Sequence, residues 1–226
     1  MKTALIACKT IEKEVEAILE QYSISMDYIF YVASGLHNST MRLQEAVKKE
    51  MEKLKELDVD RLLLCFGLCG NMIDGLETGN YETILPKTDD CITLLLGSRK
   101  RRKDLDDRER GYFLTKGWLQ GEANLHKEYK DAIAMYGQKT ADEIYQEIFD
   151  GYTCLSLIDT GQNDFEGFYE EGKEIAKDFG LKPTRIEGEM DWLTGYLMQD
   201  IERLEKNDRI VIYPPYSRMS WKDFLE

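Results

Sequence analysis

Short apolar runs alternate with amphipathic segments along most of the chain, and this alternation limits the folds open to it. The runs include TALIA at 3–7, DYIFYVA at 27–33 and RLLLCF at 61–66. Between them, apolar residues recur at spacings of three and four, which is typical of an amphipathic helix. Parallel neighbours in a sheet need crossover connections of about this length. The pattern therefore predicts a Rossmann-like α/β fold with a mostly parallel sheet and helices on both faces.

The rest of the chain continues this alternation around a charged helical region. That region, residues 118–149, is expected to be helical with a break near Gly137. Further strands are predicted at 81–85, 153–158, 183–186 and 209–213, and further helices at 88–96, 165–179 and 190–205. We expect one α/β domain over residues 1–226, with a helical insertion at about 99–150.

The charge balance argues against a nucleic-acid partner. The formal net charge is -13, which repels a polyphosphate backbone. One dense basic run, SRKRRK at 98–103, is followed at once by an acidic stretch at 104–107. We interpret this run as a solvated loop held by salt bridges, with an anion or phosphate site as the alternative.

The expected cellular compartment decides which roles are open to the cysteines. The sequence has neither an apolar stretch near the roughly 20 residues that a membrane-spanning helix needs nor a signal-peptide pattern. We therefore expect a cytoplasmic protein with no membrane partner. In that reducing compartment, the five cysteines are expected to be thiols, metal ligands or nucleophiles rather than disulfides.

Four of the cysteines follow predicted strands. Cys8 lies just past the first strand, Cys65 and Cys69 lie at the end of the third, and Cys91 lies shortly after the fourth. Ligands of parallel sheets bind outside the carboxyl ends of the strands, so neighbouring strands would bring these four thiols together. Thiolates are soft ligands that suit zinc or an iron-sulfur cluster. The sequence thus predicts a metal or iron-sulfur centre held by these cysteines.

Plain packing is the alternative for some of these thiols. Free cysteine is often buried as a small apolar residue, which suits Cys65 and, inside a strand, Cys154. Cys69 is harder to explain in this way, because the flanking Gly67 and Gly70 permit positive φ and close approach of a ligand. The opposite interpretation is that the glycines serve only a tight strand-to-helix turn capped by Asn71.

Several other residues near the predicted strand ends are candidates for the same site. Asp89 and Asp90 suit a helix N-terminus, with catalysis or support of a metal ligand as the alternative. His37 follows the second strand, where a ligand or proton-transfer role competes with that of a surface histidine. Trp118 is a candidate wall or lid over the pocket, with core packing as the alternative.

A set of short motifs resembles one known family. The motifs are FGLCGN at 66–71, DDCI at 89–92, LLLGS at 94–98, YFLT at 112–115 and Gly117-Trp118. Together they resemble the domain of unknown function 1638 family, whose members are typical of anaerobic archaea and bacteria. The resemblance implies that Cys8, Cys65, Cys69 and Cys91 match the family's cysteines. The chain departs from the family pattern at Lys87, where an arginine is expected, and at Met72, where glycine is common.

The resemblance also implies a cellular context, because the family's genes commonly lie near corrinoid-dependent methyltransferases. We therefore expect a metal- or iron-sulfur-binding protein of anaerobic one-carbon or methyl-transfer metabolism. Its expected partners are a corrinoid protein or methyltransferase and a small-molecule ligand. One alternative is a metal-free enzyme with Cys69 or Cys91 as nucleophile, and another is a non-catalytic accessory protein. Whether the chain is an enzyme stays open at this point.

Overall fold

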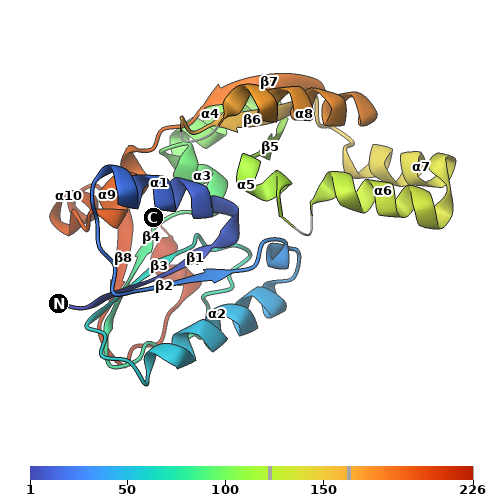
Figure 1. Ribbon diagram of the computed structural model, residues 1–226. Coiled ribbons are helices and arrows are strands. Elements are labelled where there is room, and N and C mark those ends of the chain that lie inside the picture. Colours follow the sequence, from blue (N-terminus) through green and yellow to red (C-terminus); the bar gives the residue numbers. More distant parts are fainter. Residues whose placement is uncertain (122–123, 162–163, 226) are drawn as a thin grey trace.

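The strands of the protein form two separate sheets. The computed structural model describes residues 1–121, 124–161 and 164–225, and the side chain of His37 lies outside this description. Within these residues the strands form a five-stranded and a three-stranded sheet. Figure 1 shows the smaller sheet above the larger one, with a short helix between them. None of the helices in the described ranges is long and apolar enough to cross a bilayer.

The larger sheet takes four strands from the first half of the chain and one from near its C-terminal end, and it is mostly parallel. Its strand order is β2-β1-β3-β4-β8, and only β8 runs antiparallel to its neighbour. The central strands are almost completely buried, which explains their continuous apolar sequences. The strands are β1 (Thr3–Cys8), β2 (Tyr28–Val32), β3 (Arg61–Cys65), β4 (Glu82–Pro86) and β8 (Ile210–Tyr213).

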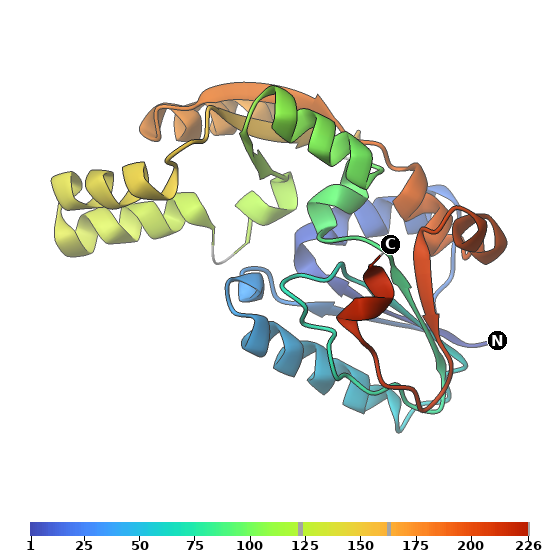
Figure 2. The ribbon, with the colours of Figure 1, turned by 180° about the vertical axis from the view of Figure 1, so that it is seen from behind.

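Helices cover both faces of this sheet. On one face, α1 packs Val15 and Ile18 beside Trp192 and Leu193 of α9. On the other, α2 and the C-terminal η3 share one apolar cluster, and Figure 2 shows η3 against the larger sheet. The helical elements here are η1 (Lys9–Ile11), α1 (Glu12–Gln21), η2 (Leu36–Asn38), α2 (Thr40–Leu54), α3 (Cys91–Leu95), α9 (Asp191–Leu197), α10 (Ile201–Lys206) and η3 (Trp221–Phe224).

The order of the strands creates a switch point at the centre of the sheet. The chain leaves β1 for β2 on one side, with α1 between them, and it returns through α2 to β3 on the other side. Beyond the carboxyl ends of β1 and β3, the two connections therefore go to opposite faces of the sheet. In open α/β sheets this divergence leaves the crevice in which ligands bind.

The smaller sheet and a helical hairpin form the upper part of the molecule. The parallel strands β5 (Gly111–Leu114), β6 (Cys154–Asp159) and β7 (Lys182–Glu187) are flanked by α4 (Arg99–Arg108) and α8 (Phe165–Asp178). The short α5 (Lys116–Leu119) follows β5, and α6 (Leu125–Tyr136) and α7 (Gln138–Ile148) project from the body as a hairpin (Figures 1 and 2). Aromatic contacts at the base, such as Tyr145 stacked on Phe179 at 5.5 Å, anchor the hairpin.

The predicted fold class is confirmed, and three local expectations need correction. The basic run at 98–103 lies mostly in helix α4 rather than in a loop, because Ser98 caps the helix and (i, i+4) ion pairs such as Arg102–Asp106 follow. The helix expected at 190–205 is two helices, broken where Gln199 takes a positive φ of 57°. Strand β5 lies inside the insertion at about 99–150, which was expected to be helical.

One buried hydrogen bond that ties α9 to the sheet can be tested by substitution. The Tyr196 hydroxyl, fully buried, donates to the Ile84 carbonyl of β4 at 2.7 Å. We expect Tyr196→Phe to lower the free energy of unfolding by about 1–2 kcal/mol, because the carbonyl loses a buried donor. Urea denaturation should show a lower midpoint with an unchanged slope. Tyr136→Phe, at an exposed ring, is the matched control, and equal midpoints for the two variants would contradict the assignment.

Candidate functional site

All four cysteines predicted to converge line a single cavity. The cavity has a volume of about 350 Å³ and lies at the carboxyl edge of the larger sheet. Its lining includes Cys8, Cys65, Cys69 and Cys91, and none of them is in a disulfide. Residues separated by more than 80 positions in the sequence are therefore brought to one place by the strand order.

The sheet register fixes the first two cysteines. Cys65 ends β3 and pairs with Ala7 of β1, so Cys8 is the next residue along the neighbouring strand. Side chains alternate along a strand, and Cys65 accordingly packs with the cluster under α1 and α9, while Cys8 packs with the cluster under α2. The cavity straddles the end of the sheet and reaches both side chains.

Cys69 is positioned by a loop that lies directly on the loop after β4. The Leu68 amide donates to the Thr88 carbonyl and the Cys69 amide to the Asp89 carbonyl, each at 2.9 Å. A Cβ atom on Gly67 would come within 2.6 to 2.8 Å of the Asp89–Asp90 backbone, which real side chains do not tolerate. Glycine at 67 is thus required for the close approach of the two loops.

The same loop has an unusual backbone conformation. Cys69, Gly70 and Asn71 have consecutive φ angles of 44°, 74° and 66°. Glycine adopts this region freely, whereas cysteine does so at a cost in energy. The φ angle of Cys69 therefore holds its side chain in a direction that an ordinary turn would not give. Strained residues of this kind gather at functional sites.

Cys91 is the first residue of α3, and its two acidic neighbours have separate roles. The Asp90 carboxylate caps the helix by accepting from the Thr93 amide at 2.7 Å, which confirms the capping interpretation. Asp90 also lines the cavity. Asp89 is exposed and forms an ion pair with Arg99 at 3.4 Å. Asp89 therefore supports the loop rather than the cavity wall.

Burial controls the ionisation of the four thiols. It raises the pKa of Cys69 to about 12, with smaller contributions from Cys8 and Asp90. It also raises the pKa values of Cys65 and Cys91, and the charge of Cys8 adds to both effects. The pKa of Cys8 is raised by burial as well, although its hydrogen bond with Thr10 opposes the shift. Without a bound cation the thiols are therefore protonated at neutral pH.

The four cysteines line one cavity, but their sulfur atoms are not arranged as the coordination shell of a metal ion. The Cys8 thiol donates to Thr10 Oγ1 at 3.2 Å. Among the described residues, no three His, Cys, Asp or Glu side chains are arranged to hold a metal ion. The donor chemistry suits a soft metal, but coordination requires the side chains to rotate toward a common point.

The opposite wall of the cavity comes from the smaller sheet and is aromatic. It is lined by Tyr112 and Phe113 of β5, by Trp118 of α5, by Tyr152 and by Arg102 of α4. The wall role predicted for Trp118 is thus consistent with its position. Sequence reasoning did not identify Arg102, Phe113 or Tyr152 as cavity residues. A signal existed for Phe113, because the YFLT motif precedes Trp118, whereas the positions of Arg102 and Tyr152 depend on tertiary packing.

The remaining sequence candidates differ in their relation to the cavity. Gly70 lines the cavity, whereas Asn71 is exposed and is followed by turns, so the expected cap of a following helix is absent from the described chain. Cys154 is buried in β6 beside Ser156, in agreement with the packing interpretation. His37 lies in η2, and its side chain is outside the described part of the structure.

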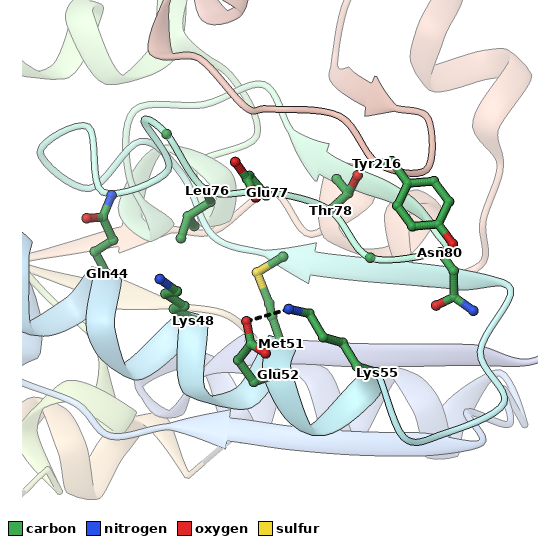
Figure 3. A pocket seen from close by; sticks show the side chains of 12 residues that line it. Gln44, Lys48, Met51, Glu52, Lys55, Leu76, Glu77, Thr78, Asn80 and Tyr216 are labelled. Atoms are coloured by element: carbon green, nitrogen blue, oxygen red, sulfur yellow. Dashed lines mark hydrogen bonds and ion pairs between the residues drawn. The ribbon is translucent and has the colours of Figure 1, made fainter.

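A larger depression lies beside α2, but its chemistry is that of an open polar surface. It has a volume of about 690 Å³ and is bordered by α2, residues 75–80 and Tyr216. Figure 3 shows Lys48 and the Lys55–Glu52 ion pair along its α2 side. Tyr216 at its rim is 81% exposed. The cysteine-lined cavity is therefore the better candidate, because it combines reactive groups with apolar walls.

Fold and site together define the class of protein: a Rossmann-like α/β protein with a cysteine-lined cavity at its switch point. The sequence model of the family described as "Protein of unknown function (DUF1638)" matches residues 31–197, which is well over half of the chain. The chain belongs to this family, and the resemblance found from the motifs is confirmed. The match includes Cys65, Cys69 and Cys91, while Cys8 precedes it. No curated protein and no solved structure matched the chain.

The raised thiol pKa values predict how stability changes with pH. Cysteine in an unfolded chain titrates near pH 8.5, whereas Cys69 in the folded protein titrates at about 12. Between these values the unfolded state loses its proton first, so stability falls as pH rises, by up to about 1.4 kcal/mol per pH unit. Denaturation of chelator-treated protein at pH 8 to 10 should show a shallower decline for Cys69→Ala. Parallel profiles for the two proteins would refute the assigned pKa.

Proposed function

We propose that the protein binds a zinc ion or an iron-sulfur cluster through Cys8, Cys65, Cys69 and Cys91, and that it works in the cytoplasm. The observation that carries the proposal is the presence of all four thiols in the lining of one cavity at the switch point. Four thiolates complete a tetrahedral zinc site or supply the corners of a cubane cluster.

The surroundings of the cysteines support this donor set. Two backbone hydrogen bonds hold the loop that carries Cys69 against the segment that precedes Cys91. Cys8 and Cys65 lie at the ends of adjacent strands. Coordination then needs side-chain rotation at these positions and the loss of the bond from Cys8 to Thr10. When bound, zinc held by four thiolates would be a closed structural centre, whereas a cluster would supply an electron-transfer group.

The alternative of a cysteine nucleophile has less support. A reactive cysteine normally has a lowered pKa and a cationic neighbour or a base beside it. Cys91 begins a helix, but it is only partly exposed, Asp90 adjoins it, and its pKa is raised. Cys69 has the same direction of shift. Buried thiols of this kind suit ligation better, because a cation replaces the protons.

The metabolic setting of the proposal rests on the family resemblance. We place the protein in anaerobic one-carbon or methyl-transfer metabolism, with a corrinoid protein or a methyltransferase as partner. An oxygen-sensitive centre held by thiolates would suit an anaerobic cell. The partner can be sought by anaerobic co-purification of the chain with a corrinoid protein, with the visible spectrum of the corrinoid as the readout.

Metal analysis of anaerobically purified protein tests the central proposal. We expect about one zinc per chain or, for a cubane cluster, about four irons with acid-labile sulfide and a broad visible charge-transfer band. Serine replacement of Cys8, Cys65, Cys69 or Cys91 should lower metal content, because each removes one thiolate ligand. Binding should strengthen as pH rises, since the ligands must lose protons.

Cys154→Ser is the matched control, because Cys154 is buried in the other sheet and lies outside the cavity lining. It should retain the full metal content. Wild-type protein that carries neither zinc nor iron under these conditions, and takes up neither on reconstitution, would refute the proposal. Equal metal loss in the Cys154 control would show that the loss comes from misfolding rather than from ligation.

A further inference from the structure

The aromatic wall of the cysteine cavity is built as a fixed surface. Tyr112 contacts Trp118 and Tyr152 edge to face, with ring centroids 6.2 and 5.7 Å apart. Phe149 packs behind Tyr112 at 5.3 Å. Rings braced in this way lose little freedom when a ligand packs against them. The wall is therefore suited to hold the apolar part of a small molecule.

Arg102 adds a single cationic group to this wall. Its guanidinium carbon lies 4.0 Å from the centre of the Phe113 ring, and its Nε donates to Asp106 at 2.9 Å. Among the described residues, Arg102 is the one basic side chain that lines this cavity. An anionic acceptor from a ligand is therefore expected at this guanidinium.

Neighbouring arginines of the same helix have other roles. Arg99 donates to the Phe224 carbonyl and pairs with Asp89, and Arg101 contacts the Glu187 carbonyl and Glu189. Neither of these arginines is part of the cavity lining, whereas Arg102 is. Arg99 and Arg101 of the basic run therefore hold the fold, whereas Arg102 lines the cavity.

The charge distribution selects the class of ligand. The cavity has Arg102 on its aromatic side and the Asp90 carboxylate, already bonded to the Thr93 amide, on its cysteine side. An anionic group therefore binds at the arginine. Guanidinium groups bind carboxylates through paired N–H donors. The volume of about 350 Å³ lies within the range of small-molecule pockets.

We propose that this cavity binds a small organic acid. The carboxylate bonds to the guanidinium group of Arg102, and the apolar part packs against Tyr112 and Trp118, facing the four cysteines. The inference rests on the proposed function in that it names the ligand class for the same cavity. The contacts that hold the acid are nevertheless made by side chains other than the cysteines, so its binding can be tested with or without a metal.

The test uses benzoate as an anionic probe and benzamide and benzylammonium as its neutral and cationic counterparts. Isothermal titration calorimetry of the full chain should show benzoate binding that is about tenfold or more stronger than that of either counterpart. Benzoate should also change the fluorescence of the wild type but not of Trp118→Phe, which places the probe at the aromatic wall. Equal affinity for benzoate and benzamide, or no benzoate binding up to about 10 mM, would overturn the proposal.

Substitution on α4 provides the second arm. Arg102→Gln should weaken benzoate binding about tenfold or more and leave benzamide binding nearly unchanged. Arg108→Gln, on the exposed end of the same helix, is the matched control and should bind benzoate as the wild type does. If Arg102→Gln does not fold, the comparison of benzoate with benzamide on the wild type still decides the question. Equal benzoate affinity in a folded Arg102→Gln would exclude the arginine as the anchor.

The two proposals fail in different ways. Metal content reports on the cysteines, and we expect it to be unchanged in Arg102→Gln. Benzoate binding reports on Arg102, and we expect it to persist in Cys69→Ser. A protein that retains metal but does not discriminate benzoate from benzamide would reject the organic acid alone. A protein that binds benzoate through Arg102 but takes up no metal would reject the metal centre alone.

Discussion

The close approach of two loops at the carboxyl edge of the larger sheet is the constraint on which the site depends. Gly67 has no side chain, so the chain after β3 can lie against the Asp89–Asp90 backbone, and two amide-to-carbonyl bonds hold it there. This contact brings Cys69 to Cys91, while the register of β1 and β3 brings Cys8 to Cys65. A larger residue at 67 would separate Cys69 from Cys91 without altering any cysteine.

A second close contact fixes the aromatic wall relative to the sulfur atoms. A side chain on Gly117 would overlap the Thr10 carbonyl, and one on Gly121 would overlap the Ser34 hydroxyl. Helix α5, which carries Trp118, therefore rests on the segments that follow β1 and β2. Thr10 also accepts the hydrogen bond from Cys8. The same short segment thus positions a thiol on one side of the cavity and an indole ring on the other.

Much of the fold could be predicted from the sequence, because buried parallel strands such as RLLLCF at 61–66 leave a strong local pattern. The placement of four cysteines at strand ends was predictable for the same reason. The second sheet was not, because the four-residue strand Gly111–Leu114 pairs with residues 43 positions later and has little pattern of its own. The role of Arg102 was also hidden, since a basic run gives no indication of which side chain faces inward. Both features depend on contacts between distant segments.

The charges of the cavity connect the two proposals. Zinc or a cubane cluster with four thiolates carries a formal charge of about −2, and Asp90 adds further negative charge nearby. Such a centre would repel an organic acid, so the carboxylate would be directed away from the sulfur atoms and toward Arg102 on the far wall. The apolar part of the acid would then face the centre. In this arrangement the separation of Arg102 from the cysteines sets the orientation of the ligand, with its carboxylate at the guanidinium and its apolar part against the aromatic rings.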